Sequence, residues 1–240
     1  MFVIPCKYSA TSNSVIELCR QIREFHPNEK ICVVDSDSSD KSYFDKIKEY
    51  DVIVMDIANK NWMVGAYWAG YLAHPSEDFY FFFHDSMKVK ANLDYLKCSD
   101  LFLFATFDRQ VAPSFNSWND RIANETLIDK KYIKREGKGC CGPIWGCRGH
   151  LMDRLCKANF DVLMPSNKAE TGYCEGSYGL ALESLGYDLN ACSLFGDILK
   201  LEEPGGKSNP DGNGPPFKTD WMWPIEKFYN SHNDKERGWE

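Results

Sequence analysis

Short apolar segments alternate with stretches of helical periodicity in the first half of the chain. Mostly apolar segments lie at 2–5, 31–34 and 51–56, and they are continuous in the way of strands buried on both faces. Apolar residues recur at helical spacing over 13–25, and a shorter helix is expected at 42–48. Strands and helices that alternate at this pitch predict right-handed βαβ units. The expected fold is therefore α/β, with a mostly parallel central sheet flanked by helices.

The longest apolar run, 79–83, consists of consecutive aromatic residues. A half-exposed strand would alternate with polar residues, so this run predicts a strand in the middle of the sheet. It ends abruptly at His84, Asp85 and Ser86. Because open α/β sheets bind ligands at the carboxyl ends of their strands, Asp85 is the first candidate for a functional residue. The alternative is that Asp85 only caps the turn that follows.

The neighbouring strands also end in polar residues. Asp35 follows the second strand, and Asp56 and Asn59 follow the third. These side chains are expected to converge on one edge of the sheet and to form a ligand cleft there. A loop and then a helix are expected over 59–71, with Gly65 near the helix start. The missing side chain at Gly65 would admit either a ligand or the sheet at close range.

The second half of the chain is less regular. A further strand is expected at 101–107, whereas 108–138 is polar and irregular. The glycine-rich segment 137–149 predicts a turn that leads into a helix at 150–158.

Glu175 is expected at the start of the next helix, which Gly186 closes. Residues 1–200 are expected to form one domain, and a Gly/Pro-rich loop and a tail follow over 201–240. Within that tail, 221–229 is apolar enough to dock back onto the domain as a helix.

The composition narrows the class of protein and of partner. With 43% hydrophobic and 26% charged residues among 240, the chain is typical of a soluble globular protein. No apolar run is long enough for a membrane span, and the start lacks the basic flank of a signal peptide, so a cytoplasmic location is expected. The net charge of −7 argues against extensive binding to nucleic acid.

The cysteines raise the question of a metal site. Cys140, Cys141, Cys147 and Cys156 lie near His150, but they lack the paired spacing of structural zinc sites. Reduced structural thiols are therefore the expected state.

Several phrases of the sequence together resemble the GT-A glycosyltransferases. These phrases are Val34-Asp35-Ser36, residues 61–66, residues 83–87 and residues 165–168. They are similar to the small glycosyltransferases of large DNA viruses of the chlorovirus type, whose members glycosylate capsid protein. The resemblance covers residues 1–190 and implies a GT-A-like, Rossmann-like domain. In it, 1–107 would be the nucleotide-sugar half and 108–200 the acceptor half, a lobe on the C-terminal side.

The resemblance implies a nucleotide-sugar donor, with UDP as the nucleotide, and a glycan or glycoprotein acceptor, for which capsid protein is one candidate. The family's Asp-x-Asp motif binds a divalent metal and the diphosphate of the donor. Here it is reduced to His84-Asp85-Ser86, so the implied Mn²⁺ (or Mg²⁺) would be held by Asp85 and His84. The residues implied to contact the donor are Pro5, Cys6, Lys7, Tyr8, Asp35, Asn61, Gly65, His84, Asp85 and Ser86.

Glycosyl transfer also needs a general base for the acceptor hydroxyl. Glu175 is the first candidate, ahead of Glu170 and Asp108, and it forms the expected catalytic pair with Asp85. The alternative for Glu175 is a solvated helix cap. One base and no evident nucleophile favour inversion. Two other functions stay open: a sugar nucleotidyltransferase, and a non-catalytic module that binds nucleotide-sugars or carbohydrate.

Overall fold

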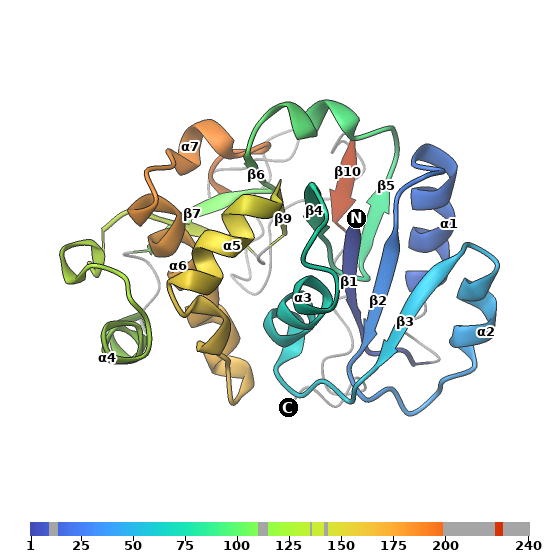
Figure 1. Ribbon diagram of the computed structural model, residues 1–240, viewed down its shortest axis with the longest axis horizontal. Helices are drawn as coiled ribbons and strands as arrows, with labels where there is room; N and C mark the ends of the chain where they lie inside the picture. The colour runs from blue at the N-terminus through green and yellow to red at the C-terminus, as the bar shows by residue number, and fades with distance from the viewer. Residues whose placement is uncertain (10–13, 110–114, 135, 142–143, 199–223, 228–240) are drawn as a thin grey trace, which may run out of the picture.

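A six-stranded sheet forms the centre of the computed structural model, which describes residues 1–9, 14–109, 115–134, 136–141, 144–198 and 224–227 (Figure 1). The strand order is β3-β2-β1-β4-β9-β6. The strands β3, β2, β1 and β4 are parallel, and β9 is antiparallel to both of its neighbours. Their bounds are β1 Phe2–Cys6, β2 Ile31–Asp35, β3 Val52–Asp56, β4 Phe79–Phe82, β6 Leu101–Leu103 and β9 Trp145–Arg148. The predicted α/β fold with a mostly parallel central sheet is confirmed.

Helices cover both faces of this sheet. One face carries α1 (Val15–Phe25) and α2 (Tyr43–Lys48), and the other carries α3 (Trp62–Ala73), α5 (Gly149–Lys157) and α6 (Lys168–Ser184) (Figure 1). The remaining helical segments are α4 Phe115–Glu125, α7 Leu189–Cys192 and the 3-10 turns Asp94–Cys98, Lys130–Tyr132 and Phe160–Val162. The helices expected at 13–25 and 42–48 are thus confirmed, with residues 10–13 outside the described part.

Two small antiparallel sheets lie beside the central one. In the first, β7 (Thr106–Asp108) pairs with β8 (Lys138–Cys140). In the second, β5 (Met87–Val89) pairs with β10 (Ile225–Lys227), so a segment close to the end of the chain returns to the strand that follows β4.

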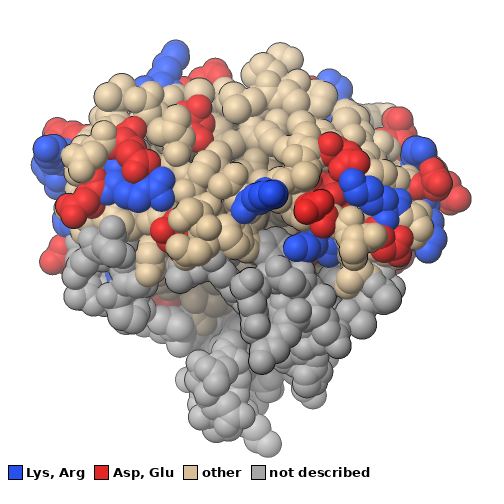
Figure 2. Space-filling model, turned by 90° about the horizontal axis from the view of Figure 1, so that it is seen from below, with Lys and Arg blue, Asp and Glu red and all other residues tan. Residues whose placement is uncertain are grey.

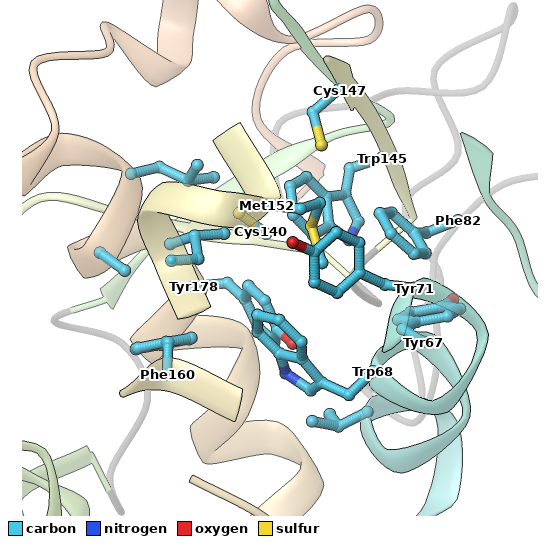
Figure 3. Packing of buried hydrophobic residues seen from close by; sticks show 14 of the residues in the cluster. Tyr67, Trp68, Tyr71, Phe82, Cys140, Trp145, Cys147, Met152, Phe160 and Tyr178 are labelled. Carbon is cyan, nitrogen blue, oxygen red and sulfur yellow. The ribbon is translucent and has the colours of Figure 1, made fainter. Parts of the chain in front are cut away.

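The aromatic run of β4 fills both layers of the core. Tyr80 and Phe82 belong to the cluster beneath α3, whereas Phe79, Phe81 and Phe83 belong to the cluster beneath α1. Because both faces of β4 are covered, every position of the run is apolar and the polar alternation of a half-exposed strand is missing. Figure 3 shows the α3 side of this core, where side chains from α3, β4, β9 and α6 meet: Tyr67, Trp68, Tyr71, Phe82, Trp145 and Tyr178.

The segment 101–107 is two strands, so the prediction of one strand was wrong. The first part is β6 in the central sheet, and the second part begins β7 in a separate sheet. The residues between them, Phe104 and Ala105, are fully buried. Because the break itself is buried and apolar, no polar residue marks it, and the sequence pattern does not reveal it.

The glycine-rich segment 137–149 was also misread, because it contains β8 and β9 as well as a turn. A Cβ atom at Gly146 of β9 would lie 2.7 Å from Phe102 Cζ of β6 and closer still to Phe102 Cε1, and 2.9 Å from Phe79 Cε1 of β4. Glycine is therefore required there for packing between aromatic neighbours. Because glycine is typical of turns, its presence led to the prediction of a turn in place of a strand. As a consequence, β4 has an antiparallel neighbour on one side.

Two helix predictions were wrong in the C-terminal half. The helix expected to start at Glu175 begins at Lys168, where the Asn167 side chain caps it by accepting a hydrogen bond from the Glu170 amide. The helix expected at 221–229 is the strand β10 over its described residues, and the rest of that segment lies outside the described part. Gly186 follows the helix with a positive φ of 93°, as expected for a helix end.

One hydrophobic cluster extends from Met1 to Leu189. It therefore crosses the expected division between the halves 1–107 and 108–200, and both halves share one core. Residues 201–223 and 228–240 of the expected tail lie outside the described part. Among the helices that the structure describes, none is both long and apolar enough to cross a membrane.

Candidate functional site

The carboxyl ends of β1 and β4 meet at a topological switch point. The strands β2 and β3 lie on one side of β1, and β4 lies on the other. In open α/β sheets this is the position at which ligands bind. We call the edge formed by the carboxyl ends of β1, β2, β3 and β4 the strand-end edge; it lies at the bottom of Figure 1. Figure 2 is seen from below, with charged side chains of both signs toward its two sides and a mostly uncharged surface between them.

A closed ring of contacts organises the ends of β1 and β2. Asp35 is 0% exposed, and its Oδ2 accepts a hydrogen bond of 2.7 Å from the Tyr43 hydroxyl. Its Oδ1 accepts one of 3.0 Å from the Ser38 amide, and Ser38 Oγ in turn accepts one of 2.7 Å from the Tyr8 amide. The Tyr8 and Tyr43 rings stack with centroids 4.6 Å apart, which closes the ring. Asp35 therefore fixes the conformation of the loop that follows β2.

This ring changes what the predicted donor residues can do. Of the predicted donor residues at the ends of β1 and β2, four have buried side chains: Pro5, Cys6, Tyr8 and Asp35. The fifth, Lys7, is half-buried. Both carboxylate oxygens of Asp35 already have partners within the protein. These buried residues shape the edge from beneath, and their contact with a donor stays a prediction.

The loop between β3 and α3 is built around Asn59. Its Nδ2 donates to Ser36 Oγ (3.1 Å) and to the Trp62 carbonyl (2.6 Å), and its Oδ1 accepts from the Asn61 amide (3.1 Å). Ala58 and Trp62 adopt left-handed φ values of 47° and 49°, a conformation that costs an L-residue roughly 1–2 kcal/mol. The hydrogen bonds of Asn59 hold this strained loop against the end of β2.

Gly65 is needed by this loop. A Cβ atom there would lie 2.6 Å from the Asn61 Cβ and closer still to Asn59 Oδ1. Packing against the loop thus explains the glycine, where the sequence left open a ligand or the sheet. The Asn61 side chain also donates a hydrogen bond of 2.9 Å to the Pro165 carbonyl, which ties the loop to the segment that begins α6.

The end of β4 is joined to β10. His84 Nδ1 lies 2.8 Å from Lys227 Nζ, and the same ammonium group donates a hydrogen bond of 2.9 Å to Ser86 Oγ. On its other side, His84 Nε2 lies 3.0 Å from Met63 Sδ of α3. The backbone carbonyl of Asp85 accepts a hydrogen bond of 2.9 Å from Ser14 Oγ, at the start of α1.

These contacts bear on the implied metal. An ammonium group can only donate hydrogen bonds, so His84 Nδ1 accepts the hydrogen bond from Lys227. The proton of the neutral ring is then on Nε2, which faces Met63. In this arrangement neither ring nitrogen has a lone pair to give to a cation. Among the described residues, no group of three or more His, Cys, Asp or Glu side chains is placed to hold a metal ion. His84 therefore does not fit the metal-ligand role, and Asp85 is the carboxylate that remains.

Asp85 and Glu175 both act on Tyr67 of α3. Burial raises the pKa of Tyr67 well above its usual value, and the nearby groups Tyr178, Asp85 and Glu175 raise it further. The Tyr67 hydroxyl is buried and makes no hydrogen bond within the described part of the chain. Buried hydroxyls normally have a partner, so this one marks a buried polar position that two carboxylates influence by their charge.

The three candidate bases, Glu175, Glu170 and Asp108, have different surroundings. Glu170 accepts hydrogen bonds from Ser166 at the N-terminal end of α6, and Asp108 pairs with Lys138 at 2.7 Å. Both carboxylates thus take part in local structure. Glu175 lies in the middle of α6, so the helix-cap alternative for it was wrong.

The charges of Glu175 and Lys227 also both affect the pKa of one thiol. Burial raises the pKa of Cys141, the charge of Glu175 raises it further, and the charge of Lys227 opposes the shift. Glu175 is thus the carboxylate whose charge reaches both Tyr67 and Cys141. All ten cysteines are free thiols.

Sequence reasoning missed Lys227 and Met63. Lys227 lies in a three-residue strand that carries no periodic signal, and its partner strand is 138 residues earlier in the chain at the Glu226–Lys88 pair. Tyr67 lies within the segment 59–71, where the sequence predicts a helix. Nothing in the sequence indicates that the Tyr67 hydroxyl lacks a hydrogen-bond partner among the described residues.

Neither the protein-family models nor the curated proteins gave a match to this chain. Among solved structures, the chain is similar to the mannosyltransferase Ktr4p from S. cerevisiae in complex with GDP, with a TM-score of 0.45, 11% identity, and coverage of 84% of this chain and 68% of that one. It is also similar to S. aureus TarS 1-349, with a TM-score of 0.38, 16% identity and 64% coverage of this chain. This chain spans 48% of the length of that TarS structure. Because these TM-scores lie below 0.5, the likenesses assign no activity here.

Proposed function

We propose that this protein is a glycosyltransferase that moves a sugar from a nucleotide-sugar donor, UDP-linked, to a hydroxyl of a glycan or glycoprotein. The observation that carries the proposal is the pair Asp85 and Glu175. One carboxylate comes from the end of β4 at the switch point, the other comes from α6, and the charges of both raise the pKa of the buried Tyr67. Two carboxylates, one from each of these elements, suit a ligand that is rich in hydroxyl groups.

In this proposal the strand-end edge binds the nucleotide. Lys7 follows β1 directly and is half-buried, which places a positively charged residue close to the switch point. The loop held by Asn59 and the ring around Asp35 give this edge a fixed shape before the ligand arrives. A preformed site lowers the entropy that binding must overcome.

The reaction itself is assigned to Glu175 and Asp85. Glu175 takes the proton of the acceptor hydroxyl while the acceptor oxygen attacks the anomeric carbon. The bond from that carbon to the diphosphate breaks, and its electron pair leaves with the diphosphate. Asp85 orients the donor sugar by accepting hydrogen bonds from its hydroxyl groups. One base on the acceptor side corresponds to inversion.

The metal dependence of this reaction is a prediction of the sequence resemblance. His84 does not fit as a ligand of Mn²⁺ or Mg²⁺, so no step here depends on the ion. If a cation binds, Asp85 is the side chain that would hold it, and the ion would supply positive charge to the diphosphate.

The test is calorimetric titration of UDP and UDP-glucose, with Mn²⁺ and with EDTA. It uses the wild type, Asp85→Ala and the matched control Asp78→Ala, which alters the amino end of the same strand β4. We expect UDP-glucose binding in the wild type and in the control, and at least about tenfold weaker binding in Asp85→Ala, since a charged hydrogen bond contributes roughly 1.5–3 kcal/mol.

Other outcomes would change the function. Binding of UDP-glucose without any release of UDP, alone or with glycan acceptors, would identify a binding module. Formation of UDP-glucose from UTP and glucose 1-phosphate would identify a nucleotidyltransferase. If neither UDP nor UDP-glucose binds, the proposed donor is wrong.

A further inference from the structure

A chain of hydrogen bonds runs from the end of β2 to the start of α6. Ser36 Oγ accepts from the Asn59 side chain (3.1 Å), and Asn59 Oδ1 accepts from the Asn61 amide (3.1 Å). The Asn61 side chain then donates to the Pro165 carbonyl (2.9 Å), in the segment that leads into α6. We propose that Asn61 is a positioning residue, which through this contact fixes α6, and with it Glu175, relative to the strand-end edge.

The segment that leads into α6 has a second tether, which comes from α4. Arg121 Nη1 donates a hydrogen bond of 3.0 Å to the Met164 carbonyl, next to the carbonyl that Asn61 binds. Ser166 donates to Glu170 from its amide (2.7 Å) and from its hydroxyl (2.8 Å), and this contact closes the first turn of the helix. Among these contacts, the hydrogen bond from Asn61 is the one that joins the helix start to the strand-end edge.

The other half of α6 is fixed against β8. A Cβ atom at Gly179 would lie within 2.8 Å of the β8 backbone, so the helix and the strand are in close contact there. Nearer the end of α6, Glu183 pairs with the buried Arg109 at 2.8 Å. Glu175 lies between this half and the start that Asn61 holds. Because α6 is one continuous helix, a shift of its start would carry the Glu175 carboxylate with it.

Backbone strain in the loop that carries Asn61 agrees with a functional role. Ala58 and Trp62 flank Asn59 and Asn61 and have φ values of 47° and 49°, which L-residues rarely adopt. Strained backbone persists where the surrounding contacts over-determine it, and it clusters at functional sites. Asn59 supplies such contacts, and the missing side chain at Gly65 leaves room for them. The loop therefore presents Asn61 to α6 in one fixed position.

This inference rests on the proposed function for the role of Glu175. A general base acts within hydrogen-bond reach of the proton that it takes, about 2.6–3.2 Å between heavy atoms. A misplacement of about 1 Å can lower the rate by roughly 100-fold. The nucleotide is proposed to bind at the strand-end edge, whereas the base is carried by α6. Loss of the Asn61 contact should therefore impair the chemical step and spare nucleotide binding.

The test is a double-mutant cycle with Asn61→Ala and Glu175→Gln. The rate measured is the release of UDP from saturating UDP-glucose, with water as the acceptor, and calorimetric titration gives the affinity for UDP. We expect Asn61→Ala to slow UDP release by about 10- to 100-fold and to keep UDP affinity within about threefold of the wild type. In the Glu175→Gln background it should slow release by less than about twofold more, because a residue that acts through the base has no effect once the base is gone.

Two further variants control the cycle. Asn61→Asp keeps the shape of the side chain but has no hydrogen to donate, so it should behave as Asn61→Ala. Asn92→Ala is the matched control, because Asn92 also donates a side-chain hydrogen bond of 2.9 Å to a backbone carbonyl, that of Phe25. This control should release UDP at the rate of the wild type.

Hydrogen–deuterium exchange gives a readout that needs neither activity nor ligand. The amides in the first turns of α6 should exchange about 3- to 10-fold faster in Asn61→Ala, in line with the loss of one hydrogen bond. The amides around Gly179 should exchange as in the wild type, because the contact with β8 is retained. The same data show whether the variant is folded.

The outcomes separate this inference from the proposed function. Unchanged UDP release or unchanged exchange in Asn61→Ala would overturn the inference, and so would an equal loss of rate in the Glu175→Gln background. Weaker UDP binding at an unchanged rate would make Asn61 a donor contact, which also overturns it. Each of these results leaves the glycosyltransferase proposal standing. A wild type that neither binds UDP nor releases it from UDP-glucose would overturn the proposed function and the role of Glu175, and the exchange data would still decide whether Asn61 fixes α6.

Discussion

Lys227 Nζ lies 2.8 Å from His84 Nδ1, although the two residues are 143 positions apart in the sequence. The contact joins a segment near the end of the chain to the carboxyl end of the central strand β4. In this contact the Nδ1 lone pair of His84 accepts a proton of the ammonium group, so that lone pair is not available to a metal ion. The attachment of β10 to β5 therefore brings a lysine side chain to the end of β4.

The first prediction concerns Glu226, which fastens β10. Glu226→Gln should lower the free energy of unfolding by roughly 1–3 kcal/mol at pH 7, because the charged hydrogen bonds to Lys88 and Lys90 are lost. Denaturant unfolding checks the stability, with the exposed Glu17→Gln as a control that should change by less than about 0.5 kcal/mol.

The hydrogen bonds from Lys88 and Lys90 make the contribution of Glu226 to the free energy of unfolding pH-dependent. Although burial alone raises the pKa of Glu226, the hydrogen bonds from Lys90 and Lys88 outweigh it and hold the pKa below its ordinary value of 4.5. A carboxyl whose folded pKa is lowered stabilises the folded state above its unfolded pKa and loses that effect as the pH falls through the folded value. The stability difference between wild type and Glu226→Gln should therefore be constant above about pH 5.5 and shrink below pH 4.5. A difference that persists unchanged at pH 3 would contradict this assignment.

Tyr67→Phe should separate binding from stability. The Tyr67 hydroxyl is buried and lacks a hydrogen-bond partner in the described structure, so its removal should leave the free energy of unfolding unchanged or raise it by up to about 1–2 kcal/mol. Release of UDP from UDP-glucose should nevertheless slow by about 2- to 10-fold, because a ligand hydroxyl loses its partner. A marked loss of stability would show that the hydroxyl is satisfied within the fold.

Tyr43→Phe is the matched contrast, since it removes a hydroxyl that does have a partner. Asp35 would lose the 2.7 Å hydrogen bond to Tyr43 and remain buried. The free energy of unfolding should fall by roughly 1–3 kcal/mol, the cost of leaving a buried acceptor unsatisfied. Thermal unfolding measures this loss, and the exposed Tyr95→Phe should show none.

Gly65→Ala should damage both the loop and the site. The added methyl group would overlap Asn59 and Asn61, so we expect a loss of about 1–3 kcal/mol and weaker nucleotide binding. Gly172→Ala is the control, because a Cβ atom there meets nothing within 4 Å. Alanine in that helix should raise stability by roughly 0.5–1 kcal/mol. Equal effects of the two substitutions would show that close packing at Gly65 is not the reason for the glycine.

Glu175→Gln tests the general base. Loss of the proton acceptor should lower the rate of UDP release in the presence of an acceptor by roughly 100- to 10,000-fold, while UDP binding is unchanged. Glu170→Gln should have a much smaller effect on the rate, since that carboxylate is engaged with Ser166. A larger effect of Glu170 than of Glu175 on the chemical step would reverse the assignment.

The sequence by itself determined the βαβ half of the fold. The continuous apolar segments around Val33 and Phe81 could only be strands covered on both faces, and a parallel sheet places their ends on one edge. That argument led directly to Asp85 at the switch point. It needed only local pattern and the handedness of the connections, both of which are short-range properties of the chain.

Tertiary structure decided the rest, because it depends on pairings between distant segments. Gly146 carries no strand signal of its own, and only the aromatic rings of Phe102 and Phe79 packed over it explain its place in β9. The presence of Lys227 next to His84 depends on a three-residue strand that is stable only when paired with β5. A long-range contact thus places Lys227 at the switch point, and no local pattern in the sequence indicates this placement.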